Sequence, residues 1–360
     1  MSSVNVVVLG DNITNNAILQ KLKLGESIKQ SVYSWAANEL AEQMRSDLPA
    51  FNGNRSNLEK HILKSLAEEE DFERFKTYIF NPRDHFEVFI TDVVKNYMKK
   101  DNPRALAVIK KIIAHKKQCV ISAAETASKM VTKKKGDANM WLEKFSTSLK
   151  DELECNTDHL SGNNCEDITD FQLLTEVVKK EIDLVLDLPN NDSKIVSAFK
   201  MEHFRKRPDE ILIEHFCQCC WVQCPFCKAI CTNTLEGHPG DHSIPFHRSI
   251  GINGWFYRRT ENLSTDFCTT CVASDRSFYP YSDSEQSVPW KEYRTAGPKY
   301  ANWSITPDFS ELPYWKWFVC RFQKDLEKHY HKKYQGSGEI PDEWRKYTKK
   351  DAIKSLYKYI

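Results

Sequence analysis

Six of the chain's twelve cysteines fall within the fifteen positions of CQCCWVQCPFCKAIC, at 217–231. Thiols gathered this closely form disulfides, hold a metal ion or carry out redox chemistry, so they constrain the fold strongly. Nine of the twelve cysteines follow residue 216, whereas a disulfide framework spreads them along a short secreted chain. The amino-terminal MSSVNVVVLGDN has no basic leader, so we expect no signal peptide. The sequence therefore favours a metal site in a reducing compartment, the cytoplasm with the nucleus as a second location.

The cysteine cluster continues into an alternating series of metal-ligand residues. Cys224-x2-Cys227-x3-Cys231 is followed by three histidines and then by a second Cys-x2-Cys pair. Zinc takes four thiolate or imidazole ligands in a tetrahedron, and a Cys-x2-Cys turn places two thiolates on one ion. One ion, or two ions sharing eight positions, satisfies this spacing. We predict structural zinc with Cys224, Cys227, His247 and Cys268 as the first set, and His242, Cys231, Cys271 and His238 as the next ligands.

Other zinc proteins fit the pattern less well. Cys224-x2-Cys227-x14-His242-x4-His247 falls within the spacing of a DNA-reading zinc finger. Pro245 lies between the two histidines, however, and a recognition helix cannot run through it. We therefore expect no sequence-specific DNA binding. A RING-type ubiquitin ligase needs a long gap after the first pair, but Cys231 follows Cys227 by four residues, so the ligase remains a weaker alternative.

The same region offers no clear catalytic residue. A catalytic zinc keeps an open coordination position beside a carboxylate, and the spacing singles out none of Glu236, Asp241 and Asp266. Redox chemistry requires a thiolate of low pKa, and acyl transfer by Cys220 with His215 has little support because such partners usually lie far apart in sequence. We expect Cys217, Cys219 and Cys220 to pack beside the metal site, and we assign no catalytic residue.

The remainder of the chain has helical periodicity. Apolar residues recur at helical spacing from 55 to 215, with Ser56 and Glu59 as a capping box and Pro103 opening a later helix. Residues 154–168 read as a loop, and Thr169 with Gln172 caps the next helix. Aromatic residues from Trp315 to Tyr330 mark one face of a helix, and Thr348 with Asp351 begins the last one.

These patterns predict a mainly α fold: a multi-helix N-terminal half, a small irregular zinc-binding module, and aromatic-rich C-terminal helices. The expected divisions are 1–54, a partly helical N-terminal segment; 55–208, a helical domain; 209–280, the Cys/His zinc-binding module; and 281–360, the aromatic-rich helical region packing on that module.

Composition excludes several functions. Lys and Arg number 51 against 50 Asp and Glu, a balance that is unusual for a protein coating nucleic acid or an anionic membrane. No stretch approaches the ~18 apolar residues of a membrane span. Gly10 follows a short apolar run, as in a phosphate-binding loop, yet none of the twelve glycines precedes a lysine. We therefore do not expect GTP to bind this chain.

Three stretches resemble the C-terminal end of the interferon-induced very large GTPases and the related up-regulator of cell proliferation. They are CPFCKAICTNTLEGHPGDHSIPFHR, GINGWFYRRTENLSTDFC and YWKWFVCRFQKDLEKHY, and the resemblance is dense from about 205 to 360. It implies an interferon-inducible, cytosolic and nuclear protein of the dynamin-like superfamily, whose GTP-binding domain lies far upstream. The family's Cys-Pro-x-Cys and His-Arg elements match Cys224 to Cys227 and His247-Arg248, and its next cysteine matches Cys268.

We expect a non-catalytic, zinc-stabilised helical module that serves assembly, through protein partners or self-association. One alternative is a fragment of a functional GTPase whose GTP-binding domain lies upstream. The other is a zinc-dependent enzyme or ubiquitin ligase.

Overall fold

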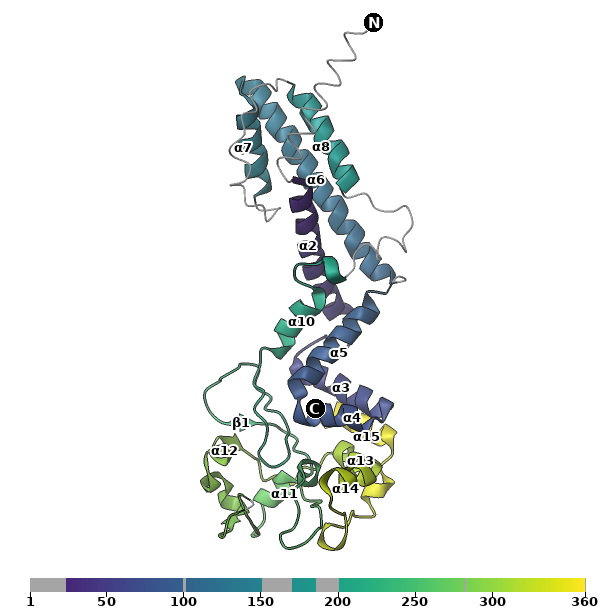
Figure 1. The fold of residues 1–360 in the computed structure, drawn as a ribbon, viewed down its shortest axis with the longest axis vertical. Helices are drawn as coiled ribbons and strands as arrows, with labels where there is room; N and C mark the ends of the chain where they lie inside the picture. The colour runs from purple at the N-terminus through teal and green to yellow at the C-terminus, as the bar shows by residue number, and fades with distance from the viewer. Residues whose placement is uncertain (1–23, 100–101, 151–169, 186–200, 282, 360) are drawn as a thin grey trace. The chain divides into compact units, whose positions relative to one another are not determined.

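The computed structural model describes residues 24–99, 102–150, 170–185, 201–281 and 283–359 (Figure 1). The fold is mainly α, as predicted, and divides into two compact units. The first unit comprises 1–44 and 93–211, and the second comprises 45–92 and 212–360. These boundaries differ from those of the expected segments, because residues 45–92 belong to the same unit as the cysteine-rich region. Helices α2 (Leu24–Asp47), α5 (Pro82–Tyr97) and α10 (Pro208–Cys217) contribute residues to both units.

The first unit is organised around the long helix α6 (Pro103–Lys134), which begins at Pro103 as predicted. Helices α7 (Ala138–Leu149) and α8 (Phe171–Val185) pack on it. The buried Ser128 links all three, since its Oγ accepts from Trp141 Nε1 at 2.8 Å and donates to the Phe171 carbonyl oxygen at 2.8 Å. Asp170 caps α8 through the Gln172 amide. Thr169, the expected cap, and the loop 154–168 lie outside the described residues.

The second unit contains a layer of helices formed by both ends of its sequence. Phe75 contacts Phe318 and Phe322, with ring centroids 4.8 and 5.2 Å apart. Asn54, and not Ser56, caps the first of these helices, because the Asn54 side chain accepts from the backbone of Asn57 at 3.1 Å. The helices are α3 (Arg55–Glu69), α4 (Phe72–Phe80), α13 (Pro313–Arg321), α14 (Gln323–Tyr330) and α15 (Lys349–Tyr359).

The aromatic C-terminal segment is core, as its periodicity predicted, but it forms two helices instead of one. Trp315, Phe318 and Leu326 are buried. The helix breaks at Phe322, whose φ of −108° and ψ of 22° are not helical. The expected cap of the last helix is confirmed, since Thr348 Oγ1 accepts from the Asp351 amide at 3.2 Å.

The remainder of the second unit is an irregular module with little regular structure. Its aromatic core surrounds the fully buried Phe226, with Trp290, Tyr300 and Phe278 at ring distances of 4.6, 5.1 and 5.2 Å. Strand β1 (His242–Ser243) pairs in parallel with β4 (Trp303–Ser304), and β2 (Ser277–Phe278) pairs antiparallel with β3 (Val288–Pro289). The remaining short helices are η3 (Ile250–Asn253), α11 (Cys268–Val272), η4 (Trp290–Ala296), α12 (Pro298–Ala301), η5 (Gly336–Gly338) and η6 (Trp344–Lys346), with η2 (Met201–His203) in the first unit.

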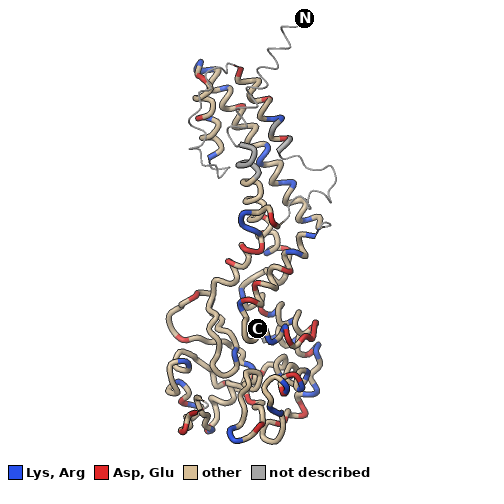
Figure 2. Tube along the Cα trace, in the orientation of Figure 1, with Lys and Arg blue, Asp and Glu red and all other residues tan. Residues whose placement is uncertain are grey.

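Acidic and basic positions are interspersed along the chain in each unit (Figure 2). Within the described ranges, no helix is both long enough and apolar enough to cross a bilayer.

Candidate metal centre

A short hairpin, residues 220–233, contains Cys220, Cys224, Cys227 and Cys231, and we call it the cysteine hairpin. Its strands are joined by amide-to-carbonyl hydrogen bonds from Cys231 to Val222 at 2.9 Å and from Cys224 to Ala229 at 2.7 Å. The turn closes through Lys228, whose φ of 63° lies in the left-handed region. Cys224 and Cys227 therefore lie at the turn, while Cys220 and Cys231 face each other diagonally across the strands.

The turn cysteines form a group with His247 and Cys268, and we call these four residues the inner group. Their donor atoms all lie within 4.8 Å of one another, and all four side chains are buried. The two sulfurs of Cys224 and Cys268 are 4.0 Å apart, and Cys227 Sγ lies 3.4 Å from His247 Nδ1. A tetrahedral zinc site places two sulfurs about 3.8 Å apart and sulfur and nitrogen about 3.6 Å apart. The sequence named these four residues as its first set.

Backbone pairing brings the distant members of the inner group to the hairpin. Ser249 and Phe267 form a β-bridge, so the segment after His247 lies beside the segment before Cys268. The Arg248 amide, immediately after His247, donates to Cys227 Sγ at 3.5 Å. Amide-to-sulfur bonds of this kind support a metal-bound thiolate. Nε2 of His247 has no hydrogen-bond partner among the described residues, which departs from the usual support of a ligand imidazole.

The thiols of the inner group are not equivalent. Burial raises the pKa of Cys224 and of Cys268 well above the usual value. Burial acts the same way on Cys227, but hydrogen bonds from the other two thiols and the His247 imidazole outweigh it and lower the pKa of Cys227 well below its usual value. A divalent ion takes the place of thiol protons when it binds, so such a cluster is chemically suited to a metal.

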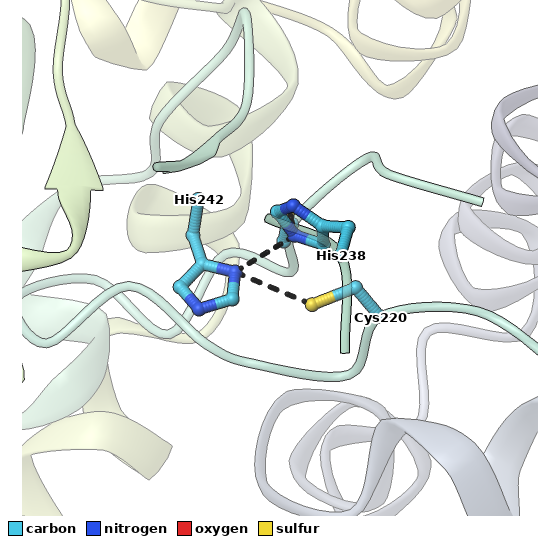
Figure 3. A group of neighbouring side chains, drawn as sticks. Cys220, His238 and His242 are labelled. Carbon is cyan, nitrogen blue, oxygen red and sulfur yellow. Dashed lines mark hydrogen bonds between the residues drawn. The ribbon is translucent and has the colours of Figure 1, made fainter. Parts of the chain in front are cut away.

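A second group, which we call the outer group, consists of Cys220, Cys231, His238 and His242, again with all donor atoms within 4.8 Å. Cys220 Sγ lies 3.4 Å and His238 Nε2 lies 3.1 Å from Nδ1 of His242. Figure 3 shows this nitrogen facing both of those side chains. Cys231 Sγ lies 3.6 Å from His238 Nε2. The cysteine hairpin contributes two cysteines to each group: Cys224 and Cys227 at its turn, and Cys220 and Cys231 farther from the turn.

The sequence named three members of the outer group but assigned Cys220 to packing. Cys220 and Cys231 are separated by ten residues, a spacing that matches no familiar ligand motif. Only the pairing of the hairpin strands brings them together. Cys271, named among the further ligands, belongs to neither group: it is buried near Arg276, whose Nη2 lies 3.8 Å from its sulfur.

The candidate catalytic groups have other partners. Asp241 accepts from Arg294 at 2.7 Å, and Asp266 accepts from both terminal nitrogens of Arg276 at 3.0 Å. Neither these carboxylates nor Glu236 joins a group. Burial raises the pKa of Cys217 to about 12 and that of Cys219 to about 11, so neither is an activated thiolate. The Cys220 thiol faces His242, whereas the sequence offered His215 as its partner.

The fold and the two groups define a mainly helical protein with an irregular cysteine–histidine module. Residues 220–356 match the sequence model of a protein family, described as the C-terminal domain of interferon-induced very large GTPase 1. This range includes all eight residues of both groups. The chain is 39% identical to the Mus musculus interferon-induced very large GTPase 1 over 338 residues, 94% of its length. It is 38% identical to the Homo sapiens protein of the same name over 339 residues, 93% of its length.

The chain therefore belongs to the interferon-induced very large GTPase family and contains its C-terminal domain, as the three stretches indicated. It spans 14% of the length of each of these relatives. No solved structure matches it.

Proposed function

We propose that this chain is a non-catalytic, zinc-stabilised helical module that serves assembly, either with protein partners or with further copies of itself. The observation that carries the proposal is the inner group, in which three thiols and one imidazole converge at distances that suit one tetrahedral ion.

The burial of the inner group supports a structural role for the ion. A catalytic zinc keeps a position open for water or substrate, whereas a structural zinc is closed by four protein ligands. Cys224, Cys227 and Cys268 have no exposed surface and His247 is 1% exposed, so four ligands are present and water has no access. Asp241 and Asp266, the nearby acids, are held by arginines.

The irregular module has little regular secondary structure, which supports a role for the ion in holding its segments together. The module has two-residue strands and short helices, so few backbone ladders hold its segments together. One ion in the inner group would join the cysteine hairpin, the His247 segment and the start of α11. A structural zinc contributes on the order of 10 kcal/mol of folding free energy in small modules. Free thiols in such numbers also suit a reducing compartment, and we place the module in the cytoplasm, with the nucleus as a second location.

A second candidate function is favoured by the names of the two relatives. Both are called GTPases, and the chain spans 14% of each, so the chain can act as part of a larger GTP-binding protein. No glycine in the chain precedes a lysine, however, so we do not assign the nucleotide site to these residues.

Elemental mass spectrometry on protein purified under reducing conditions tests the proposal. We expect bound zinc, a lower zinc content in the double variant Cys224→Ser with Cys227→Ser, and loss of cooperative melting in that variant. Cys271→Ser is the matched control, because Cys271 is equally buried but lies in neither group.

A GTP titration and sedimentation velocity complete the test. Saturable GTP binding would favour the second candidate. A monomer that binds no protein partner in either metal state would contradict the assembly role. Unchanged protein that carries no metal, or a double variant that melts like the unchanged protein, would overturn the structural claim.

A further inference from the structure

The geometry points to a second zinc site, formed by Cys220, Cys231, His238 and His242, whose ion exchanges more readily than that of the inner group. This inference deepens the proposed function and rests on it, because the second ion would stabilise the same module. It uses none of the residues of the inner group.

The distances within the outer group suit one tetrahedral ion. Bond lengths of about 2.3 Å to sulfur and about 2.0 Å to nitrogen place sulfur and nitrogen about 3.6 Å apart and two nitrogens about 3.3 Å apart. The two sulfur–nitrogen distances are 3.4 and 3.6 Å, and the nitrogen–nitrogen distance is 3.1 Å. Three independent edges of the tetrahedron are therefore present.

Supporting hydrogen bonds orient the donors toward a common point. Nδ1 of His238 lies 3.2 Å from the Pro239 carbonyl oxygen and donates to it, which leaves the lone pair on Nε2 directed into the group. The Asn233 amide donates to Cys231 Sγ at 3.5 Å. In the absence of an ion, that lone pair can accept one hydrogen, either from the Cys231 thiol or from a protonated Nδ1 of His242. A metal ion would bind the two sulfurs and two imidazole nitrogens together and remove this competition.

A catalytic pair or a disulfide would use only part of the outer group. A Cys220–His242 catalytic pair would leave Cys231 and His238 without a role, although both lie within the same group. A disulfide between Cys220 and Cys231 would leave both imidazoles without a role. A single metal ion uses all four side chains.

Exposure distinguishes the two sites. Every ligand of the inner group is buried, whereas His242 in the outer group is half-buried. A chelator therefore reaches the outer ion first. Both histidine rings lie near the buried Trp303, at 5.8 Å for His242 and 6.2 Å for His247.

Native mass spectrometry of the full chain, purified under reducing conditions with zinc, tests the inference. We expect two zinc ions in the unchanged protein and in Cys219→Ser, the matched control with a buried thiol outside both groups. Cys220→Ser should retain one ion. If Cys220→Ser fails to fold, His242→Ala replaces it, because a half-buried side chain is lost with less disturbance.

The outcomes separate this inference from the proposed function. One ion that survives Cys220→Ser and His242→Ala but is lost with Cys224→Ser would overturn the second site and leave the proposed function intact. Absence of zinc from the unchanged protein would overturn both. Two ions in the unchanged protein should leave in two phases under chelator, with only the slow phase in His242→Ala. Release in one phase would overturn the claimed difference in exchange.

Discussion

The guanidinium of Arg55 donates from Nη1 to the carbonyl oxygen of Cys231 at 2.6 Å and to that of Cys220 at 3.3 Å. Arg55 is the first residue of α3 and is 4% exposed. Its guanidinium carbon lies 4.7 Å from the centroid of the Trp221 ring. One buried cation therefore joins the helical layer to both strands of the cysteine hairpin, so the metal groups and the helices of the second unit should unfold together.

Replacing Arg55 tests this coupling. Arg55→Ala leaves two buried carbonyl oxygens without their donor, so we expect the free energy of unfolding to fall by about 3 kcal/mol. Arg55→Lys should recover only part of this loss, because an ammonium lacks the planar face that stacks on Trp221. Urea denaturation measures both. The control Arg83→Ala removes an exposed pair with Glu87 and should change stability by no more than about 0.5 kcal/mol. Equal effects of Arg55→Ala and Arg83→Ala would contradict the coupling.

A second set of buried hydrogen bonds connects the residue after His247 to helices α3 and α4. Arg248 donates from Nη2 to Tyr78 Oη at 2.9 Å, and Tyr78 Oη donates to Glu59 Oε1 at 2.5 Å. Burial raises the pKa of Tyr78 well above its usual value, so the hydroxyl keeps its proton. Tyr78→Phe should lower the free energy of unfolding by about 1–3 kcal/mol, since two buried charged groups each lose a partner.

Thermal and chemical denaturation measure the effect of Tyr78→Phe. Tyr357→Phe is its control, because Tyr357 is 51% exposed and its hydroxyl can contact water. A neutral Tyr78→Phe variant would show that the Arg248–Tyr78–Glu59 chain does not stabilise the unit.

Gly251 provides a steric test of the packing near the metal centre. An added Cβ at this position would lie 2.1 Å from the backbone oxygen of Ser264, which cannot move as a side chain does. We expect Gly251→Ala to cost about 3 kcal/mol or more, read as a lower melting temperature. Gly237→Ala is the comparison, because nothing lies within 4 Å of its Cβ and only its φ of +66° opposes the change. A milder effect of Gly251→Ala than of Gly237→Ala would show that the two segments are not in contact.

His85 predicts a pH dependence of stability. Burial, with a smaller effect of Arg74, lowers the pKa of His85 from 6.5 to about 4. Between these values the unfolded chain binds a proton that the folded chain does not. The free energy of unfolding should therefore fall as the pH falls from about 6.5 to about 4, by at most about 3 kcal/mol from this residue.

Urea denaturation across this pH range, compared with His85→Phe, measures the contribution of His85. The variant keeps a ring against Tyr78, which lies 5.8 Å from the histidine ring, and should flatten part of the slope. Metal loss at low pH affects both proteins, so the difference between their slopes is the quantity to compare. Parallel slopes would contradict the assigned pKa.

The sequence predicted local features better than tertiary ones. The four inner residues lie close together. The Cys-x2-Cys turn is set by nearby residues, and the matched motifs indicated His247 and Cys268; that these residues hold zinc stays a prediction. Cys220 was missed, since its place depends on pairing across the hairpin. Helical periodicity identified the aromatic core but not the break at Phe322. The apolar spacing continues unchanged through this residue although its backbone is not helical, so the pattern does not mark the break.

Cap and unit boundaries depend on where the backbone leaves a helix and on which segments pack together. Asn54 replaces Ser56 as the cap of α3 because the chain enters the helix earlier than the capping-box pattern suggests. Residues 45–92 follow one helical segment and precede another in sequence, yet they belong to the unit of the cysteine hairpin. Spacing along one chain carries no signal for this grouping.

The most direct test of the central claim is zinc K-edge X-ray absorption on the double variant Cys220→Ser with His242→Ala, which isolates the inner group. We predict a coordination shell of about three sulfurs near 2.3 Å and about one nitrogen near 2.0 Å. A shell of only nitrogen and oxygen, or a variant that folds without zinc, would contradict a structural ion held by Cys224, Cys227, His247 and Cys268.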